Sequence, residues 1–201
     1  MKKINILIAI VILLSIISCK KDFLDRYPYD KKVVGNFYKT PEDAFEALVA
    51  VYDVLQGGVV GNNEYDHIIL MSEIASDNCY GGAGANDDQR LQVWDDFEQV
   101  FPDPHALQWR KYYQGIYRTN MLLENIDNVE WGNSVHLKNR YICEARFLRA
   151  FYYFDLIRLF GNVPLLTEVA DAENLKIPQA DPAEVYKVIA EDLQYAIENL
   201  P

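Results

Sequence analysis

Residues 139–168, NRYICEARFLRAFYYFDLIRLFGNVPLLTE, decide how this 201-residue chain folds. Apolar residues recur there at steps of three and four, which is the spacing of one helical face. A second apolar stripe lies about a quarter-turn away, so we expect neighbouring helices to cover this helix on two sides. The first face consists of Leu137, Tyr141, Ala145, Leu148, Tyr152, Leu156 and Leu159, and the second of Phe147, Phe151, Phe154 and Ile157.

The end of this helix is marked by Gly161, because glycine readily adopts the left-handed conformation that closes many helices. Pro164 follows, and proline does not continue a helix. Two pairs of opposite charge stand three or four residues apart: Arg140 with Glu144, and Asp155 with Arg158. These spacings allow ion pairs on a helix face, and we interpret the pairs as ordinary salt bridges.

The runs EARFLRAFYYF at 144–154 and LFGNVPL at 159–165 closely resemble the signature helix of the SusD/RagB family of outer-membrane nutrient-uptake lipoproteins. The segments CKKDFLD at 19–25 and FYKTPEDA at 37–44 are also similar to that family. The resemblance implies an all-α fold of tetratricopeptide-like helical hairpins with long irregular loops. It covers essentially the whole chain but only the first part of the family's length, so we expect an apparently truncated N-terminal portion.

The first residues are typical of a bacterial lipoprotein. A basic start precedes an apolar run at 4–17, which is too short to span a bilayer comfortably. Ser18 and Cys19 provide the small residue and the thiol that lipoprotein processing needs, so we expect lipidation of Cys19. The alternative is an ordinary secretory peptide with an incidental cysteine. We predict a signal peptide at 1–18, a lipidated tether at 19–39 and a helical domain at 40–201.

Other helices are expected from their capping residues. Thr40 and Pro41 begin one helix, which ends before Gly57, and Asp181 begins the last one in a capping-box arrangement. Ser134 is expected to cap the central helix. The connection before it is short, so the helix expected at 104–128 should pack antiparallel to the central one. A further helix is expected at 64–75, and residues 91–100 are ambiguous.

Apolar spacing also predicts the buried face of each of these helices. The predicted inner residues are Phe45, Leu48, Val49, Tyr52 and Leu55 in the first helix; Trp109, Tyr113, Ile116, Tyr117, Asn120, Leu123 and Ile126 in the long one; and Tyr186, Ile189, Leu193, Ala196, Ile197 and Leu200 in the last.

Composition and motifs exclude several functions. The net charge of −11, without a basic stripe, argues against binding to nucleic acid or to anionic lipid by charge. The three histidines form no metalloprotease motif, and the glycines at 81–84 lack the lysine of a phosphate-binding loop. Nearby acidic residues do not have the spacing of a calcium loop. We therefore predict no enzyme activity, no cofactor and no metal site.

Residues 76–94 are the candidate site, because this Gly-rich polar stretch has no periodicity and is expected to be a loop. Sugar recognition needs an aromatic face for stacking and planar polar groups for the hydroxyls. The candidate glycan-binding residues are Tyr80, Asn86, Asp87, Arg90 and Trp94. The alternative is a plain solvated loop with Trp94 in the core. Cys79 and Cys143 could pair in an oxidising compartment, but we expect two free thiols, one in a loop and one within a helix.

The resemblance implies a cell-surface lipoprotein of the outer membrane that captures oligosaccharides and delivers them to a TonB-dependent transporter. It further implies that part of the glycan contact comes from this N-terminal loop region. The alternative function is a tetratricopeptide-like scaffold on the outer membrane that binds a peptide or a protein.

Overall fold

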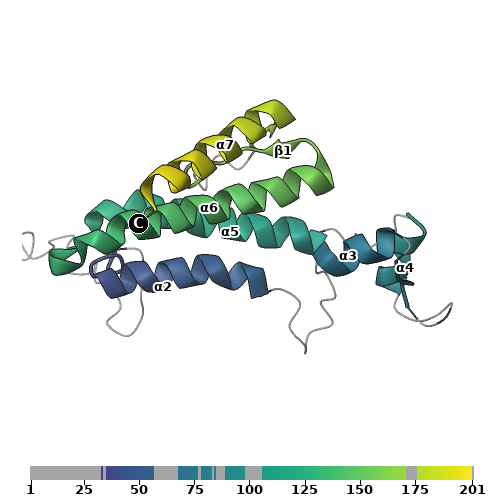
Figure 1. Ribbon diagram of the computed structural model, residues 1–201, viewed down its shortest axis with the longest axis horizontal. Helices are drawn as coiled ribbons and strands as arrows, with labels where there is room; N and C mark the ends of the chain where they lie inside the picture. The colour runs from purple at the N-terminus through teal and green to yellow at the C-terminus, as the bar shows by residue number, and fades with distance from the viewer. Residues whose placement is uncertain are drawn as a thin grey trace, which may run out of the picture. The chain divides into compact units, whose positions relative to one another are not determined.

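Figure 1 shows the computed structural model of the chain, in which most of the described residues are helical, as the sequence predicts. The structure describes residues 33, 35–56, 68–76, 78–82, 84, 89–97, 106–170 and 176–200. The chain divides into two compact units, Met1–Phe37 and Tyr38–Pro201, and all the elements below belong to the second. The signal peptide at 1–18, Cys19 and most of the tether expected at 19–39 lie outside the described residues.

Helices and short turns follow one another along the second unit. The helices are α2 (Pro41–Tyr52), α3 (Ile68–Ala75), α4 (Gln89–Asp95), α5 (Ala106–Asn125), α6 (Val135–Phe160) and α7 (Pro182–Asn199). The 3-10 turns are η2 (Asp53–Gln56), η3 (Ile126–Asn128) and η4 (Gly132–Ser134). The strands β1 (Val163–Pro164) and β2 (Gln179–Ala180) pair antiparallel, with Val163 opposite Ala180.

Helix α6 is the centre of this unit, because it packs against α7, α5 and α2. The short turns η3 and η4 connect α5 to α6, and the two helices run antiparallel as predicted (Figure 1). The first predicted face of α6 is confirmed, since Tyr141, Ala145, Leu148, Tyr152 and Leu156 are all buried. The core therefore forms along the stripe that the spacing of apolar residues indicates.

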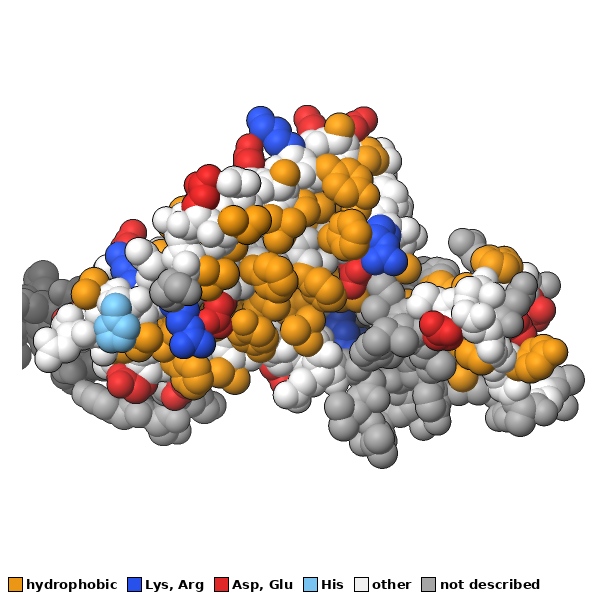
Figure 2. Space-filling view, in the orientation of Figure 1, with side chains coloured by type: hydrophobic (Ala, Val, Ile, Leu, Met, Phe, Trp, Pro, Cys, Tyr) orange, Lys and Arg blue, Asp and Glu red, His pale blue; other side chains and the backbone are white. Residues whose placement is uncertain are grey.

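The second stripe of α6 does not have the expected cover. Phe147, Phe151 and Phe154 are 47%, 39% and 41% exposed, and only Ile157 is buried. Figure 2 shows apolar side chains at the surface over the middle of α6. Other helices do cover α6 on more than one side, but α7 packs on the flank that carries Arg149, because that arginine pairs with α7.

The inner face of α2 differs from the predicted one for a steric reason. Small or medium side chains, Ala44, Ala47, Leu48 and Val51, are the buried ones, and they let α2 approach α5 and α6 closely. The predicted inner residues Phe45, Val49, Tyr52 and Leu55 are between 39% and 52% exposed.

The predicted inner faces of α5 and α7 are partly wrong. On α5, Ile116 and Asn120 are buried as predicted, as is Ile126 at the start of η3. Tyr117 is exposed, and the buried Tyr112 and Leu122 were not expected. On α7, Ile189 and Ala196 are confirmed. Tyr186, Ile197 and Leu200 are exposed, because Val185 and Asp192 turn toward α6 instead.

Helix ends follow the predicted caps with two exceptions. Thr40 caps α2 as predicted and forms a capping box with Asp43, in which the Thr40 hydroxyl accepts from the Asp43 N–H at 3.3 Å. Asp181 caps α7 by accepting from the Ala183 N–H at 2.8 Å, a single bond in place of the capping box that was predicted there. Gly161 has a φ of +69° and closes α6 as expected. Ser134 was wrongly expected to cap α6: it lies in η4 with ψ of 13°, whereas a side-chain cap needs extended backbone.

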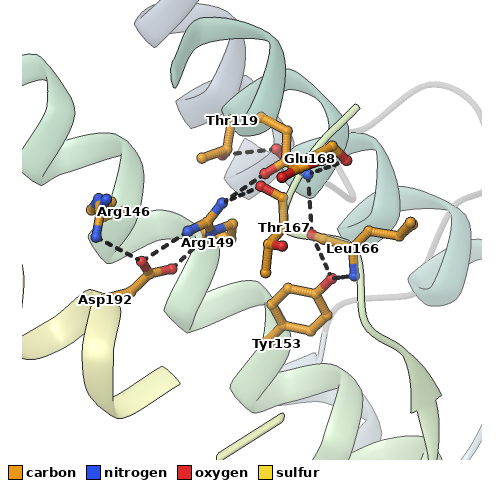
Figure 3. Close-up of polar contacts among 10 residues, drawn as sticks. Thr119, Arg146, Arg149, Tyr153, Leu166, Thr167, Glu168 and Asp192 are labelled. Atoms are coloured by element: carbon orange, nitrogen blue, oxygen red, sulfur yellow. Dashed lines mark hydrogen bonds and ion pairs between the residues drawn. The ribbon is translucent and has the colours of Figure 1, made fainter. Parts of the chain in front are cut away.

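A buried ion pair joins α6 to α7 (Figure 3). Arg149 donates from Nε and Nη2 to the two carboxylate oxygens of Asp192, at 2.7 and 2.9 Å. The two side chains are only 7% and 2% exposed. The Arg149 Nη1 atom donates to Asn120 Oδ1 on α5 and to the Thr167 carbonyl. One guanidinium therefore connects three helices to the segment that follows β1.

The same network continues through the backbone after β1. Asn120 donates from Nδ2 to the carbonyls of Leu166 and Glu168, at 3.1 and 3.0 Å. The Tyr153 hydroxyl donates to the Leu166 carbonyl and accepts from the Leu166 N–H, at 2.9 and 2.7 Å (Figure 3). These bonds satisfy polar backbone groups of an irregular segment that lies against the helices.

Buried tyrosines make a second set of bonds between elements. Tyr112 donates to Asp155, Tyr113 to the Pro164 carbonyl and Tyr152 to the Val51 carbonyl, at 2.9, 2.7 and 2.7 Å. Burial raises the pKa of all three phenols, and it raises the pKa of Tyr153 to about 12. Each of these hydroxyls is therefore protonated in the folded protein at neutral pH.

We predict that replacing Arg149 with Met destabilises the protein by about 3 kcal/mol, because the buried Asp192 carboxylate loses its bidentate partner and keeps only Arg146, at 3.6 Å, as an ion-pair partner. The double variant Arg149→Met/Asp192→Leu should recover much of this loss, since neither charge remains. Urea unfolding followed by circular dichroism measures both values. A single variant as stable as the wild type would show that the pair is not the main constraint on α7.

We also predict that the free energy of unfolding falls as the pH rises above 10. The folded-state pKa of Tyr153 lies near 12, above its ordinary value of 10.0, so unfolded chains release protons first and ionisation favours unfolding. The check is an alkaline titration in which tyrosinate absorbance and helical circular dichroism are recorded together. Full ionisation of the tyrosines with the helices intact would contradict the prediction.

Candidate functional site

Helices α3 and α4 carry the segment that the sequence singles out. The two helices contact each other, and their buried side chains are Met71 and Ile74 on α3 and Val93 on α4. The chain between them includes Tyr80 and the glycines at 81, 82 and 84. This segment has no regular helix or strand among its described residues, as predicted, whereas residues 89–94 of the stretch expected to be a loop are helical and belong to α4.

The connecting loop is attached to both helices by polar contacts. At the α3 end, Ser76 donates to the Glu73 carbonyl at 3.1 Å and Asn78 donates to the Glu73 carboxylate at 3.2 Å. At the α4 end, Gln92 donates from Nε2 to the Gly84 carbonyl at 2.7 Å. The described part of the loop is therefore held at each end.

Gly81 lies directly against the backbone of α4. A Cβ atom added at Gly81 would stand 2.5 Å from the Leu91 carbonyl oxygen, so only glycine fits there without movement. Gly81 and Leu91 are the chain neighbours of Tyr80 and Arg90. The backbones of these two predicted site residues are therefore brought close together, although they are ten positions apart in the sequence.

Tyr80 points into solvent from this loop. Its side chain is 89% exposed, which is the highest value among the exposed large apolar residues of the described chain. Most of its ring surface is therefore free to contact a ligand. An exposed aromatic ring on a loop tied to two helices can stack on the apolar face of a sugar.

Of the other four predicted site residues, the structure describes the backbone of Arg90 and the whole of Trp94. Arg90 and Trp94 both lie in α4, and the Trp94 side chain is half-buried. Asn86 and Asp87, and the side chain of Arg90, lie outside the described residues. The structure thus places Tyr80 and α4 together, while the five-residue glycan site stays a prediction.

Sequence reasoning missed the residues that support the loop. Gln92 and Gly81 hold it against α4, but both contacts cross eight to ten positions in a segment without periodicity. The cluster of glycines indicated a loop, and a close backbone approach is one common reason for glycine. Nothing in the sequence identified Leu91 as the residue that Gly81 approaches.

A hollow between α6 and α7 is a weaker candidate for ligand binding. It has a volume of about 540 Å³, and Arg146, Lys187, Gln194 and Tyr195 are among its lining residues. The Arg146 guanidinium already covers one face of the Tyr195 ring, 4.1 Å from the ring centre. The Gln194 amide is bound to Glu198 at 2.6 Å. These planar groups are therefore engaged within the protein.

We also searched the described residues for metal-binding groups, membrane-spanning helices and disulfides. Among these residues no three side chains of His, Cys, Asp or Glu lie close enough together to hold a metal ion. No helix among them is long and apolar enough to cross a membrane. Cys79 is an exposed free thiol, Cys143 is a buried one, and burial raises the pKa of the Cys143 thiol. The two cysteines are not paired.

Comparison with known proteins places these features in a family. The SusD-like family model described as "Starch-binding associating with outer membrane" matches residues 22–201. The chain is 29% identical to SusD-like protein P38 of Formosa agariphila, over 99% of its own length and 38% of that protein. It thus spans less than two-fifths of the length of this relative.

Solved structures show the same fold. A laminarin binding SusD-like protein is 34% identical, with a TM-score of 0.70 over 82% of this chain and 35% of that one. Surface glycan-binding protein A from Bacteroides thetaiotaomicron, in complex with laminarihexaose, is 26% identical with a TM-score of 0.66. That match covers 80% of this chain and 32% of the other. The prediction of tetratricopeptide-like helical hairpins of the SusD type is confirmed.

We predict that Gly81→Ala separates the loop from α4, because the new Cβ would overlap the Leu91 carbonyl. Hydrogen exchange of residues 78–84 should become faster, while the melting temperature changes little because the contact lies outside the core around α6. Gly84→Ala is the matched control, since nothing lies within 4 Å of a Cβ added there. Equal exchange in the two variants would contradict the proposed support of the loop.

Proposed function

The chain belongs to the SusD-like family, and on that premise we propose that it binds glycans through the loop between α3 and α4. The observation that carries this proposal is the 89% exposure of Tyr80 on a loop that is held against two helices. A ring held in this way loses little conformational freedom when a sugar stacks on it. The loop therefore combines exposure with the support that a binding residue needs.

Each candidate residue has a proposed role. Tyr80 and Trp94 provide aromatic faces for the apolar side of a sugar ring. Asn86, Asp87 and Arg90 provide planar amide, carboxylate and guanidinium groups that bind neighbouring hydroxyls. Binding of this kind needs no covalent step, no metal and no cofactor. The proposed role is therefore capture of a glycan and not its cleavage.

The comparisons suggest which ligand to test first. One similar structure is titled a laminarin binding protein and another contains laminarihexaose. Those titles describe the relatives, which are much longer than this chain. We propose laminarihexaose as the first oligosaccharide to test, within a panel of other glycans.

We further propose a location and a partner. Lipidation of Cys19 would anchor the mature protein in the outer membrane, and several acyl chains on one residue give stable anchoring. The family description names association with the outer membrane, which supports this location. The captured oligosaccharide would then pass to a TonB-dependent outer-membrane transporter. The alternative, a scaffold for peptides or proteins, is supported by the helical hairpin of α5 and α6.

We predict that the chain binds an oligosaccharide of the panel and that Tyr80→Ala weakens this binding about tenfold, which corresponds to about 1.4 kcal/mol for a lost stacking contact. The melting temperature should not change, because the ring is almost fully exposed. Isothermal titration calorimetry and thermal unfolding measure the two effects. Tyr186→Ala on α7 is the matched control, since this exposed tyrosine lies outside the site.

Several outcomes would assign the protein differently. Unchanged affinity in Tyr80→Ala would remove the loop from the binding site. Binding of peptides without binding of any glycan would favour the scaffold, and turnover of a glycan would establish an enzyme. Trp94→Ala tests the second aromatic residue: a large fall in melting temperature with unchanged affinity would assign Trp94 to the core.

A further inference from the structure

Phe97, at the end of the segment that carries the candidate site, is an exposed aromatic residue outside the five predicted site residues. It follows the last residue of α4 by two positions, and its side chain is 76% exposed. Among the large apolar side chains of the described chain, only that of Tyr80 is more exposed. The other exposed aromatic side chains in the described ranges are between 39% and 52% exposed. The two most exposed aromatic rings therefore belong to one short part of the chain, residues 80–97.

The backbone of Phe97 is in the left-handed region, with a φ of +52°. This conformation is unfavourable for residues with a Cβ atom and is rare for bulky ones. Tyr38 also has a positive φ, but its side chain is only 6% exposed, so packing of the ring holds that conformation. Phe97 has no such burial. An outlier that packing does not explain is a reason to look for a function, because such residues cluster at ligand sites.

Helix α4 connects Phe97 to the loop of the candidate site. The Gly81 backbone lies against the Leu91 carbonyl on this helix. Beyond that contact, the Asp96 N–H donates to the Gln92 carbonyl at 2.9 Å, so helical bonding continues to the residue before Phe97. At a rise of about 1.5 Å per residue, Phe97 lies roughly 9 Å along the axis from Leu91. The two exposed rings are therefore attached at two separate points of one support.

The residues next to Phe97 in the sequence are polar. Asp95 is half-buried and Asp96 is exposed, and both carry carboxylates. Carboxylate oxygens accept hydrogen bonds from hydroxyl groups, and an aromatic ring stacks on the apolar face of a sugar. A protein–protein interface would instead need a broad apolar centre. One exposed ring beside planar acceptors therefore fits a glycan better than a protein partner.

We propose that Phe97 is a second stacking position of the glycan site, and that the site takes an oligosaccharide whose different sugar units contact Tyr80 and Phe97. The proposal rests on the proposed function, because it adds a contact to the same site. The attachment points are roughly 9 Å apart along α4, which is more than the width of one sugar ring. A short oligosaccharide therefore occupies only part of the site, and Phe97 selects for chain length.

The test measures the affinity of the intact 201-residue chain for laminarihexaose, or for the panel member that binds in its place, by isothermal titration calorimetry. Phe97→Ala should weaken binding about tenfold, as expected for one lost stacking contact. Phe97→Trp should keep the wild-type affinity, because an aromatic face remains. Ile197→Ala is the matched control, since this apolar side chain is 74% exposed and lies on α7 outside the site.

Phe97→Gly separates the role of the ring from that of the backbone. Glycine adopts a positive φ without steric cost, so the melting temperature should not fall, whereas the affinity should fall as in Phe97→Ala. A melting temperature that falls by several degrees in both variants, together with the affinity, would show that the ring supports packing. That result would overturn the proposed stacking position.

Chain length is tested with the disaccharide of the same linkage, which is laminaribiose for laminarihexaose. Tyr80→Ala should weaken binding of both sugars, whereas Phe97→Ala should weaken mainly that of the hexasaccharide. An equal loss for the two sugars in Phe97→Ala would place both rings around one short ligand and overturn the proposed selection for length.

The same measurements separate this proposal from the proposed function. Weaker binding in Tyr80→Ala, with wild-type affinity in Phe97→Ala, would overturn the second stacking position and leave the glycan site as proposed. A wild-type chain that binds no glycan of the panel would overturn both.

Discussion

The rest of the structure depends on the buried ion pair between Arg149 and Asp192. A charge removed from water must meet an opposite charge and fill its remaining hydrogen bonds, or it destabilises the fold by several kcal/mol. Arg149 meets this requirement with Asp192, Asn120 and the Thr167 carbonyl. Because these partners come from α7, α5 and the segment after β1, one side chain fixes how three elements lie on α6. Apolar packing alone would tolerate small shifts of α7 along α6, whereas a bidentate pair specifies one position.

The position of α7 also explains the exposed phenylalanines. Arg149 and Phe147 point to different sides of α6, so a helix that pairs with the arginine cannot also cover Phe147. On the opposite side, the small residues Ala44 and Ala47 bring α2 close to α6 and leave Phe45 outside. The contacts between these helices are thus made by polar and small side chains, and several large aromatic side chains remain at the surface.

The sequence predicted features that depend on local spacing. The first face of α6, the helix start at Thr40 and the end of α6 before Gly161 are all decided within a few residues, and all are confirmed. Periodicity shows which residues share a face but not which neighbour covers it, and for this reason the predicted inner face of the first helix is confirmed only at Leu48. The predicted cap at Ser134 does not form, because Ser134 is the last residue of the 3-10 turn η4. Arg149 and Asp192 are 43 residues apart, so no local pattern joins them.

In the candidate site, too, the sequence predicts local features but not the contacts between elements. Glycines and polar residues predicted a loop at 76–94, of which 89–94 prove helical, but the approach of Gly81 to Leu91 and the bond from Gln92 depend on how α3 and α4 pack. These helices bury only a few described side chains of their own, namely Met71, Ile74 and Val93, and none of them belongs to the core cluster around α6. Substitutions at Tyr80 therefore leave the ion pair and the tyrosine bonds intact. A fold arranged in this way can change the residues that contact a ligand while the helices that support them stay the same.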